Sequence, residues 1–109
     1  MWRKQSNKYG AIKSEYNGIV YHSKREAAYA QELDLRKKAG DIKDWQRQIP
    51  FVFTVNGIKI CTYIIDFSIE KNDGTTEYVE IKGHYTSIFG IKWRLFRALY
   101  PDLDARIEY

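Results

Sequence analysis

The sequence predicts a single domain of the α/β or α+β class, with a mixed central β-sheet flanked by helices and an N-terminal β-hairpin. Runs of β-branched and aromatic residues fill the middle of the 109-residue chain, as is typical of strands. Segments with helical spacing of apolar residues stand before and after that region. Two Asn-Gly pairs, at 17–18 and 56–57, indicate tight hairpin turns, because both residues tolerate a positive φ.

The composition is that of a globular protein with one modest core, which is what 109 residues allow. No apolar run approaches the roughly 18 residues of a membrane span, and the first residues lack a signal-peptide pattern. With the lone cysteine Cys61 and no zinc-site spacing, we expect a cytoplasmic protein without a disulfide. Residues 1–9 are interpreted as a basic N-terminal arm and residues 10–109 as the domain.

The first part of the chain predicts a hairpin followed by a helix. Glu15 to Tyr21 surrounds the first Asn-Gly pair and predicts two short strands. The segment that begins Ser23-Lys24-Arg25-Glu26 has the form of a capping box, and Gly40 suits the position just after a helix. We therefore expect a helix at about 24–39.

The middle of the chain predicts strands at 45–48, 51–55, 58–69 and 75–82. Pro50 is expected to separate the first two of these strands. The turn at 71–74 is expected to join the last two into a hairpin.

The last part predicts a loop, a second helix and a final edge strand, at 83–87, 88–100 and 105–109. Helical spacing assigns the buried face of this helix to Ile88, Ile91, Leu95, Phe96 and Leu99. Lys92 falls within that face. Its stem can lie along apolar surface, or its ammonium can reach toward a metal site or a phosphate.

Two charged residues of one late strand are expected on the same face. Because side chains alternate, Val79 and Ile81 share an apolar face suited to packing on a helix, while Tyr78, Glu80 and Lys82 share the other. Glu80 and Lys82 lie roughly 6.6 Å apart along the strand. The carboxylate can bind a cation there, and the ammonium can orient a water, help to deprotonate it, or neutralise charge on a phosphate.

Asp66 interrupts an apolar run, where burying a carboxylate is costly unless it is paired or coordinates a metal. In a hairpin folded at 71–74 without a bulge, the register sets Asp66 opposite Glu80. Cross-strand neighbours lie about 4.5–5.5 Å apart, which suits two carboxylates that chelate one hard cation. The pair is therefore the candidate metal site.

Glu26 is a candidate third carboxylate. It shares a helical stripe with Tyr29, Ala30 and Leu33, which should face the sheet. Two interpretations stay open: Glu26 bonds backbone N–H groups near Ser23, or it supplies a second metal position.

Basic residues interleaved with aromatic ones crowd the start of the chain and the late helix, and the net charge is +4. This distribution suits a phosphate backbone, and a solvated charged surface is the alternative. Gln46 and Gln48 alternate on one strand, and either could contact the site or DNA. The candidate DNA contacts are Arg3, Lys4, Lys8, Lys13, His84, Lys92, Arg94 and Arg97.

The order of the acidic residues and the lysine resembles the PD-(D/E)XK nuclease superfamily, which has the restriction-endonuclease-like fold. The wider pattern looks like a group of small phage and prophage proteins of that superfamily. The order helix Glu, strand Asp, then Glu-x-Lys is similar to phage endonuclease I, archaeal Holliday-junction resolvases and the end-cleaving subunit of some transposons. The resemblance covers about residues 8–101 and rests on Ser23 to Ala27 at a helix start, Tyr63 to Phe67, and Val79 to Gly83 followed by Thr86.

The resemblance implies a Mg²⁺ site in which Mn²⁺ can substitute. By it, Asp66 and Glu80 bind the ion, the Ile81 carbonyl adds a ligand, and Lys82 assists the attacking water. Glu26 matches the helix carboxylate of the endonuclease I and resolvase groups.

The resemblance implies a metal-dependent endodeoxyribonuclease that hydrolyses phosphodiester bonds and is structure-selective for branched DNA, as a Holliday-junction resolvase is. Its setting would be phage or prophage DNA recombination or processing, in the host cytoplasm if the chain is phage-encoded. One departure from the family pattern is Ile65, which stands where the motif has proline before the aspartate; that proline is often absent in the superfamily.

The expected partners are DNA and a second copy of the chain, since a junction presents two opposed strands. No membrane and no organic cofactor is expected. The alternatives are a nicking or trimming nuclease of low specificity, a non-cleaving DNA-binding module on the same fold, and a small structural protein whose charges form surface salt bridges.

Overall fold

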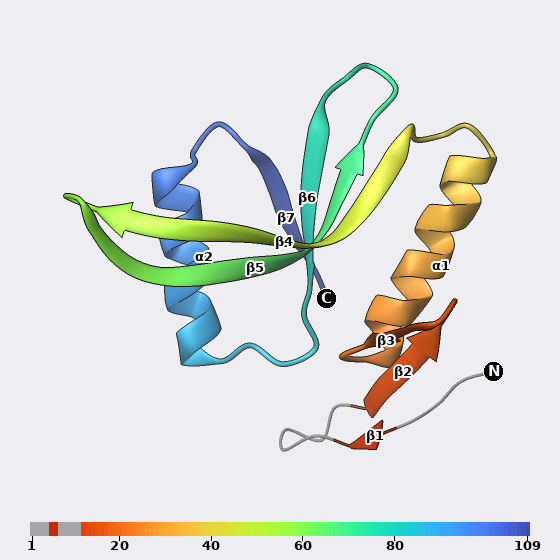
Figure 1. Ribbon diagram of the computed structural model, residues 1–109, viewed down its shortest axis with the longest axis horizontal. Helices are drawn as coiled ribbons and strands as arrows, with labels where there is room; N and C mark the ends of the chain where they lie inside the picture. Colours follow the sequence, from red (N-terminus) through yellow and green to blue (C-terminus); the bar gives the residue numbers. More distant parts are fainter. Residues whose placement is uncertain (1–4, 7–11) are drawn as a thin grey trace. The chain divides into compact units, whose positions relative to one another are not determined.

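The computed structural model describes residues 5–6 and 12–109, and the chain divides into two units, Met1–Ile42 and Lys43–Tyr109. Its fold is α+β, as expected, with N-terminal antiparallel strands and a four-stranded mixed sheet (Figure 1). Neither helix of the described part is long and apolar enough to cross a membrane. The elements are β1 (Gln5–Ser6), β2 (Ile12–Tyr16), β3 (Ile19–Tyr21), α1 (Lys24–Lys38), β4 (Asp44–Val55), β5 (Ile58–Glu70), β6 (Thr76–Ile81), α2 (Ser87–Leu99) and β7 (Asp104–Glu108).

The first unit contains an antiparallel sheet of order β1-β2-β3. β2 and β3 form the expected hairpin, and its turn residues Asn17 and Gly18 have φ of 53° and 80°. Gln5 and Ser6 pair with β2, so this part of the proposed arm is a strand. Three of the candidate DNA contacts lie outside the described residues: Arg3, Lys4 and Lys8.

Helix α1 lies against β2 and β3, and its ends agree with the expected caps. The Oγ of Ser23 accepts a hydrogen bond from the backbone N–H of Glu26 at 3.1 Å, and Gly40 follows the helix with φ of 82°. The predicted inward stripe is confirmed, since its members are buried: Glu26, Tyr29, Ala30 and Leu33.

The second unit is built on a sheet of order β4-β5-β6-β7. β4, β5 and β6 are antiparallel neighbours, and β7 runs parallel to β6 at the edge of the sheet, where the final strand was expected. The β4–β5 turn uses Asn56 and Gly57, with φ of 51° and 77°. This is the left-handed backbone that an Asn-Gly turn requires.

β4 is one continuous strand, so the expected break at Pro50 is wrong. Pro50 sits within the ladder opposite Ile64. β4 is an edge strand with a partner on one side only, and a residue without an N–H is tolerated at an edge. The strand is instead irregular at Gln48, whose φ is 53°, and between Phe53 and Thr54, where the register to β5 shifts.

The buried face of α2 also differs from the expected one. Ile88 and Ile91 are 67% and 57% exposed, although both were assigned to it. Phe96 is buried as expected, and Phe89, which was not assigned to that face, is buried too. The helix carries two apolar stripes, and the aromatic one packs inward. Aromatic rings bury more apolar area than isoleucine and meet other rings in the sheet, so this stripe gives the better core.

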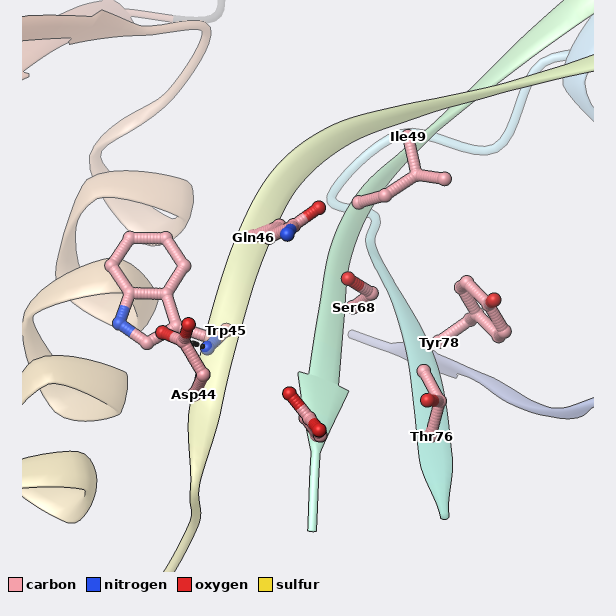
Figure 2. Close-up of a pocket in the computed structure, with 8 residues that line it drawn as sticks. Asp44, Trp45, Gln46, Ile49, Ser68, Thr76 and Tyr78 are labelled. Atoms are coloured by element: carbon pink, nitrogen blue, oxygen red, sulfur yellow. Dashed lines mark hydrogen bonds between the residues drawn. The ribbon is translucent and has the colours of Figure 1, made fainter. Parts of the chain in front are cut away.

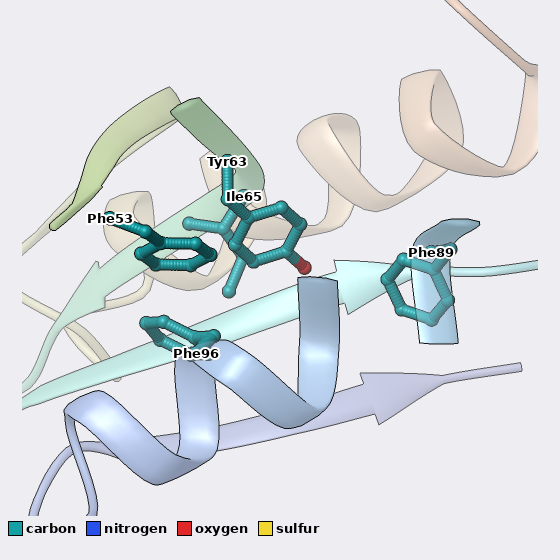
Figure 3. Close-up of a cluster of buried hydrophobic side chains, with 5 residues drawn as sticks. All are labelled: Phe53, Tyr63, Ile65, Phe89 and Phe96. Atoms are coloured by element: carbon teal, nitrogen blue, oxygen red, sulfur yellow. The ribbon is translucent and has the colours of Figure 1, made fainter. Parts of the chain in front are cut away.

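The core of the second unit is an aromatic cluster between α2 and the sheet. Phe53 and Tyr63 of β4 and β5 meet Phe96 of α2, with ring centroids 6.5 Å and 5.6 Å from that of Phe96. Ile65 and Phe89 complete the cluster (Figure 3). The cluster fixes α2 on the face of the sheet to which Tyr63 points.

This packing predicts that Phe96→Ala lowers the free energy of unfolding by about 3–5 kcal/mol, because it leaves a cavity in the core. Ile88→Ala on the same helix should cost less than about 1 kcal/mol, since an exposed side chain gives up little burial. Urea unfolding followed by circular dichroism measures both values. A larger loss for Ile88→Ala than for Phe96→Ala would contradict the assigned face.

Candidate active site

Asp66 and Glu80 lie where the ladder between β5 and β6 ends. The last backbone pair is Phe67 with Val79, which is the register expected from the turn at 71–74. At the next position the Oδ2 of Asp66 accepts a hydrogen bond from the backbone N–H of Ile81 at 2.8 Å. The carboxylate thus replaces a strand–strand bond at the point where pairing stops.

Glu80 is the most enclosed charged residue of this site, at 4% exposure. Its Oε1 accepts a hydrogen bond from the hydroxyl of Tyr63 at 2.7 Å. The hydroxyl of Tyr63 projects from the aromatic core (Figure 3). The carboxyl group of Asp66 lies close enough to that of Glu80 for its charge to raise the pKa of Glu80. The expected juxtaposition of the two acids is therefore present.

Burial raises the pKa of Glu80 to about 9, and the charge of Asp66 acts in the same direction. The hydrogen bond from Tyr63 and the charge of Lys82 lower this pKa, but by less than burial raises it. Burial, followed by the charge of Glu80, also raises the pKa of Tyr63, so its hydroxyl remains a donor. Glu80 therefore holds a proton at neutral pH unless a cation compensates its charge.

Lys82 directly follows β6 and lies beside Glu80, as side-chain alternation predicted. Its Nζ lies 3.9 Å from the Oε2 of Glu80 and 4.1 Å from the centroid of the Phe89 ring. A cation over an aromatic face is attracted by the ring quadrupole. The first turn of α2 thus holds the ammonium beside the carboxyl pair.

The alternation of side chains along β5 is interrupted next to Asp66. Ile65 lies in the cluster beneath α2, and Tyr78 packs on the same cluster. Ser68 pairs with Tyr78 and so faces that same side, although it stands three residues after Ile65. Regular alternation would place residues three apart on opposite faces. The break turns Asp66 to the side of Glu80.

A polar pocket of about 230 Å³ opens on the face of the sheet that carries Tyr78 and Glu80 (Figure 2). It lies on the side of Tyr78 away from Glu80 along β6, toward Thr76. It is a separate hollow from the carboxyl pair, since neither Asp66 nor Glu80 lines it. Its lining residues are Asp44, Trp45, Gln46, Ile49, Ser68, Glu70, Thr76 and Tyr78.

The donor set of the second unit fits a hard divalent cation. Mg²⁺ is commonly bound by one or two carboxylates, with waters and substrate phosphates at its other positions. Asp66 and Glu80 are such a pair, and one oxygen of each is fixed by Ile81 N–H or the Tyr63 hydroxyl. Among residues 5–6 and 12–109, no group of three or more His, Cys, Asp and Glu side chains is arranged to hold a metal ion.

Glu26 belongs to the first unit, so its suggested part in the metal site stays a prediction. The cap at Ser23 involves the backbone N–H of Glu26. The Ile81 carbonyl likewise stays a predicted ligand, and the side chain of Ile81 is buried.

The structure places the remaining predicted DNA contacts in several environments. Lys13, on β2 of the first unit, is half-buried. His84 and Arg94 are exposed. Lys92 is half-buried, although the apolar face expected around it is not the buried one. Arg97 donates to the carbonyl of Leu103 at 2.7 Å and thereby supports the turn after α2.

Sequence reasoning missed Tyr63 and Phe89, which hold Glu80 and Lys82. Strand alternation counted back from Asp66 assigns Tyr63 to the opposite face, so periodicity argued against this contact. Phe89 could have been found from its spacing, since it stands seven residues before Phe96 on one stripe of the helix.

Comparison with known families gives one match: the family described as protein of unknown function (DUF1064) matches residues 6–108. No curated protein and no solved structure gives a significant match.

The raised pKa of Glu80 predicts that the free energy of unfolding falls as pH rises through neutrality, when EDTA keeps the protein free of divalent cations. The folded-state pKa of Glu80 is raised from 4.5 to about 9, so the folded state binds this proton more tightly. The stabilisation that this bound proton provides is complete below the unfolded-state pKa of Glu80. It is lost as pH rises through the folded-state pKa. Its slope is at most about 1.4 kcal/mol per pH unit.

Urea unfolding across this range measures the slope. Glu80→Gln keeps an oxygen acceptor for Tyr63 but does not titrate, so its slope should be shallower than that of the natural chain. Glu32→Gln, at an exposed position of α1, is the matched control and should keep the natural slope. A slope unchanged in Glu80→Gln would assign it to another group.

Proposed function

We propose that this chain, which belongs to the DUF1064 family, is a metal-dependent endodeoxyribonuclease. Asp66 and Glu80 hold a divalent cation, and Lys82 acts on the phosphodiester beside it. The observation that carries the proposal is the pair of neighbouring carboxyl groups, Asp66 bonded to the Ile81 N–H and Glu80 to the Tyr63 hydroxyl, with an ammonium 3.9 Å from Glu80. The PD-(D/E)XK pattern of the sequence supports the same assignment.

The carboxyl pair has no evident value for stability. Burying Glu80 next to a second acid raises its pKa and makes the charged form costly. A purely structural protein would gain by replacing such a pair with apolar side chains. Strongly perturbed acids beside a cationic group are typical of functional sites. A divalent cation would relieve both the burial and the repulsion.

Mg²⁺, when bound, supplies Lewis-acid chemistry that activates water and offsets charge on the phosphate. The chain's own groups do the rest. The Tyr63 hydroxyl holds one oxygen of Glu80 and the Ile81 N–H holds one oxygen of Asp66, and the second oxygen of each acid would bind the cation. Lys82, fixed by the Phe89 ring, presents a donor to a phosphate oxygen or to the attacking water.

DNA is the proposed substrate, because the net charge is +4 and basic side chains accompany the late helix. Arg94 is exposed there and is available to a phosphate backbone. Such contacts position the backbone without reading sequence. We therefore propose structure-selective cutting of branched DNA, for which a symmetric dimer would present two sites to opposed strands.

Asp66→Asn, Glu80→Gln and Lys82→Ala should each lower the cleavage rate at least about 100-fold, with DNA affinity retained, because each removes a group needed in the transition state. Labelled four-way junctions, linear duplexes and single strands, each with Mg²⁺, Mn²⁺ or EDTA, provide the assay. Cleavage should require the cation and be fastest on the junction.

Matched controls are Asp102→Asn and Lys59→Ala, which change exposed residues of the same types. They should cleave at the natural rate. Equal rates for all three site variants and the natural chain in Mg²⁺ would place the site elsewhere. Mg²⁺-dependent binding without any product would instead indicate a DNA-binding module.

Cation binding should also release protons at neutral pH. Because the pKa of Glu80 is about 9 in the ion-free protein, binding of one cation to the pair should release about one proton. Isothermal titration calorimetry with Mg²⁺ or Mn²⁺, in two buffers of different ionisation enthalpy, measures this number. Glu80→Gln should release none, and a release equal to that of the natural chain would exclude Glu80 as a ligand.

A further inference from the structure

Gln48 has a backbone conformation that is unusual for its place in the chain. It stands inside β4, yet its φ is 53°, in the left-handed region. The other non-glycine residues with positive φ among the described residues, Asn17 and Asn56, occupy hairpin turns where this conformation is expected. For a longer side chain within a strand it is strained, and such strain persists only where the surrounding structure imposes it.

The position of Gln48 coincides with the change of face next to Asp66. The ladder pairs Arg47 with Phe67 and Ile49 with Ile65, so Gln48 is level with Asp66, and this pair is absent from the ladder. The pairing resumes in the same register on both sides, so both strands are irregular at one level. Paired irregularities of this kind bend strands and re-aim side chains.

The alternation of side chains along β4 is also interrupted at this point. Gln46 and Ile49 both line the pocket on one face of the sheet, although they are three residues apart (Figure 2). Their partners Ser68 and Ile65 show the same three-residue step on β5. Between Gln46 and Ile49 the strand visibly bends in Figure 2. The left-handed residue lies inside this step.

We propose that Gln48 is a positioning residue: its left-handed backbone creates the paired break that turns Asp66 toward Glu80. Without the break, alternation from Ile65 would place Asp66 on the opposite face from Glu80. Gln48 acts through its backbone, since its side chain is exposed. The consequence for catalysis rests on the proposed function, whereas the consequence for the orientation of Asp66 does not.

Substitutions at 48 separate backbone from side chain. Glycine and asparagine adopt the left-handed conformation readily, whereas valine is branched at Cβ and does not. Gln48→Gly and Gln48→Asn should therefore keep the break, and Gln48→Val should oppose it. Gln46→Val is the matched control, because it makes the same change at another exposed position two residues earlier on β4.

The readout is the Ile81 amide, whose hydrogen bond to the Oδ2 of Asp66 reports the orientation of that carboxylate. Hydrogen exchange by NMR should show natural protection of this amide in Gln48→Gly, Gln48→Asn and Gln46→Val. In Gln48→Val the protection should fall roughly tenfold, as the penalty for a branched residue in this region implies. Protection of the Lys82 amide, which bonds the Glu108 carbonyl, should stay unchanged and so control for general unfolding.

Cleavage assays on the same proteins give the second readout. The kcat of Gln48→Val should fall about tenfold or more with an unchanged KM for DNA, since the orientation of Asp66 affects chemistry rather than binding. Gln48→Gly should keep the natural kcat. If the natural chain cleaves no DNA, the proposed function fails while the exchange experiment still decides the role of Gln48.

Two outcomes would overturn the role of Gln48. The first is loss of Ile81 protection in Gln48→Gly, which would assign the effect to the amide side chain. The second is natural protection in Gln48→Val, which would show that Asp66 keeps its orientation without the left-handed residue. Should Gln48→Val fail to fold, Gln48→Gly and Gln48→Asn decide the matter, because both must retain the protection.

Discussion

The candidate site of the second unit depends on the burial of Glu80 between the hydroxyl of Tyr63 and the carboxyl of Asp66. An acid at this depth is tolerated only with hydrogen-bond partners and either a proton or a cation. Its surroundings supply a hydrogen-bond donor and a positive charge. Tyr63 donates a hydrogen bond from the aromatic core, and the ammonium of Lys82 lies 3.9 Å from Glu80. The residues that bury Glu80 therefore also hold it at the place where the proposed cation would bind.

The aromatic core and the candidate site share residues. Tyr63 and Phe89 belong to the cluster that holds α2 on the sheet, and each also touches a charged residue of the site. Because cores are densely packed, these contacts hold Glu80 and Lys82 in fixed positions. Preorganised groups of this kind stabilise charge in a transition state without reorganising, which is the property that the proposed hydrolysis requires.

Asp66 is positioned by the strand ladder and not by the aromatic core. It extends the ladder through its side chain, which bonds the Ile81 N–H where pairing of β5 and β6 ends. This geometry needs the break in alternation, and the left-handed Gln48 lies at the same level on β4. Strain placed next to an acidic pair is an arrangement typical of functional sites. Family membership adds no activity of its own, so the proposal rests on this geometry and on the sequence pattern.

The sequence alone determined what local chemistry controls: the caps of α1, the Asn-Gly turns, the fold class and the register that sets Asp66 level with Glu80. Tertiary packing decided the rest. The buried face of α2, the continuity of β4 through Pro50 and the contacts of Tyr63 depend on which surfaces meet. A left-handed glutamine has no local sequence signal, because only the neighbouring strands impose that conformation. Periodicity and register could therefore predict that Asp66, Glu80 and Lys82 lie together. They could not predict the supporting contacts of Tyr63 and Phe89, or the bend that turns Asp66 toward Glu80.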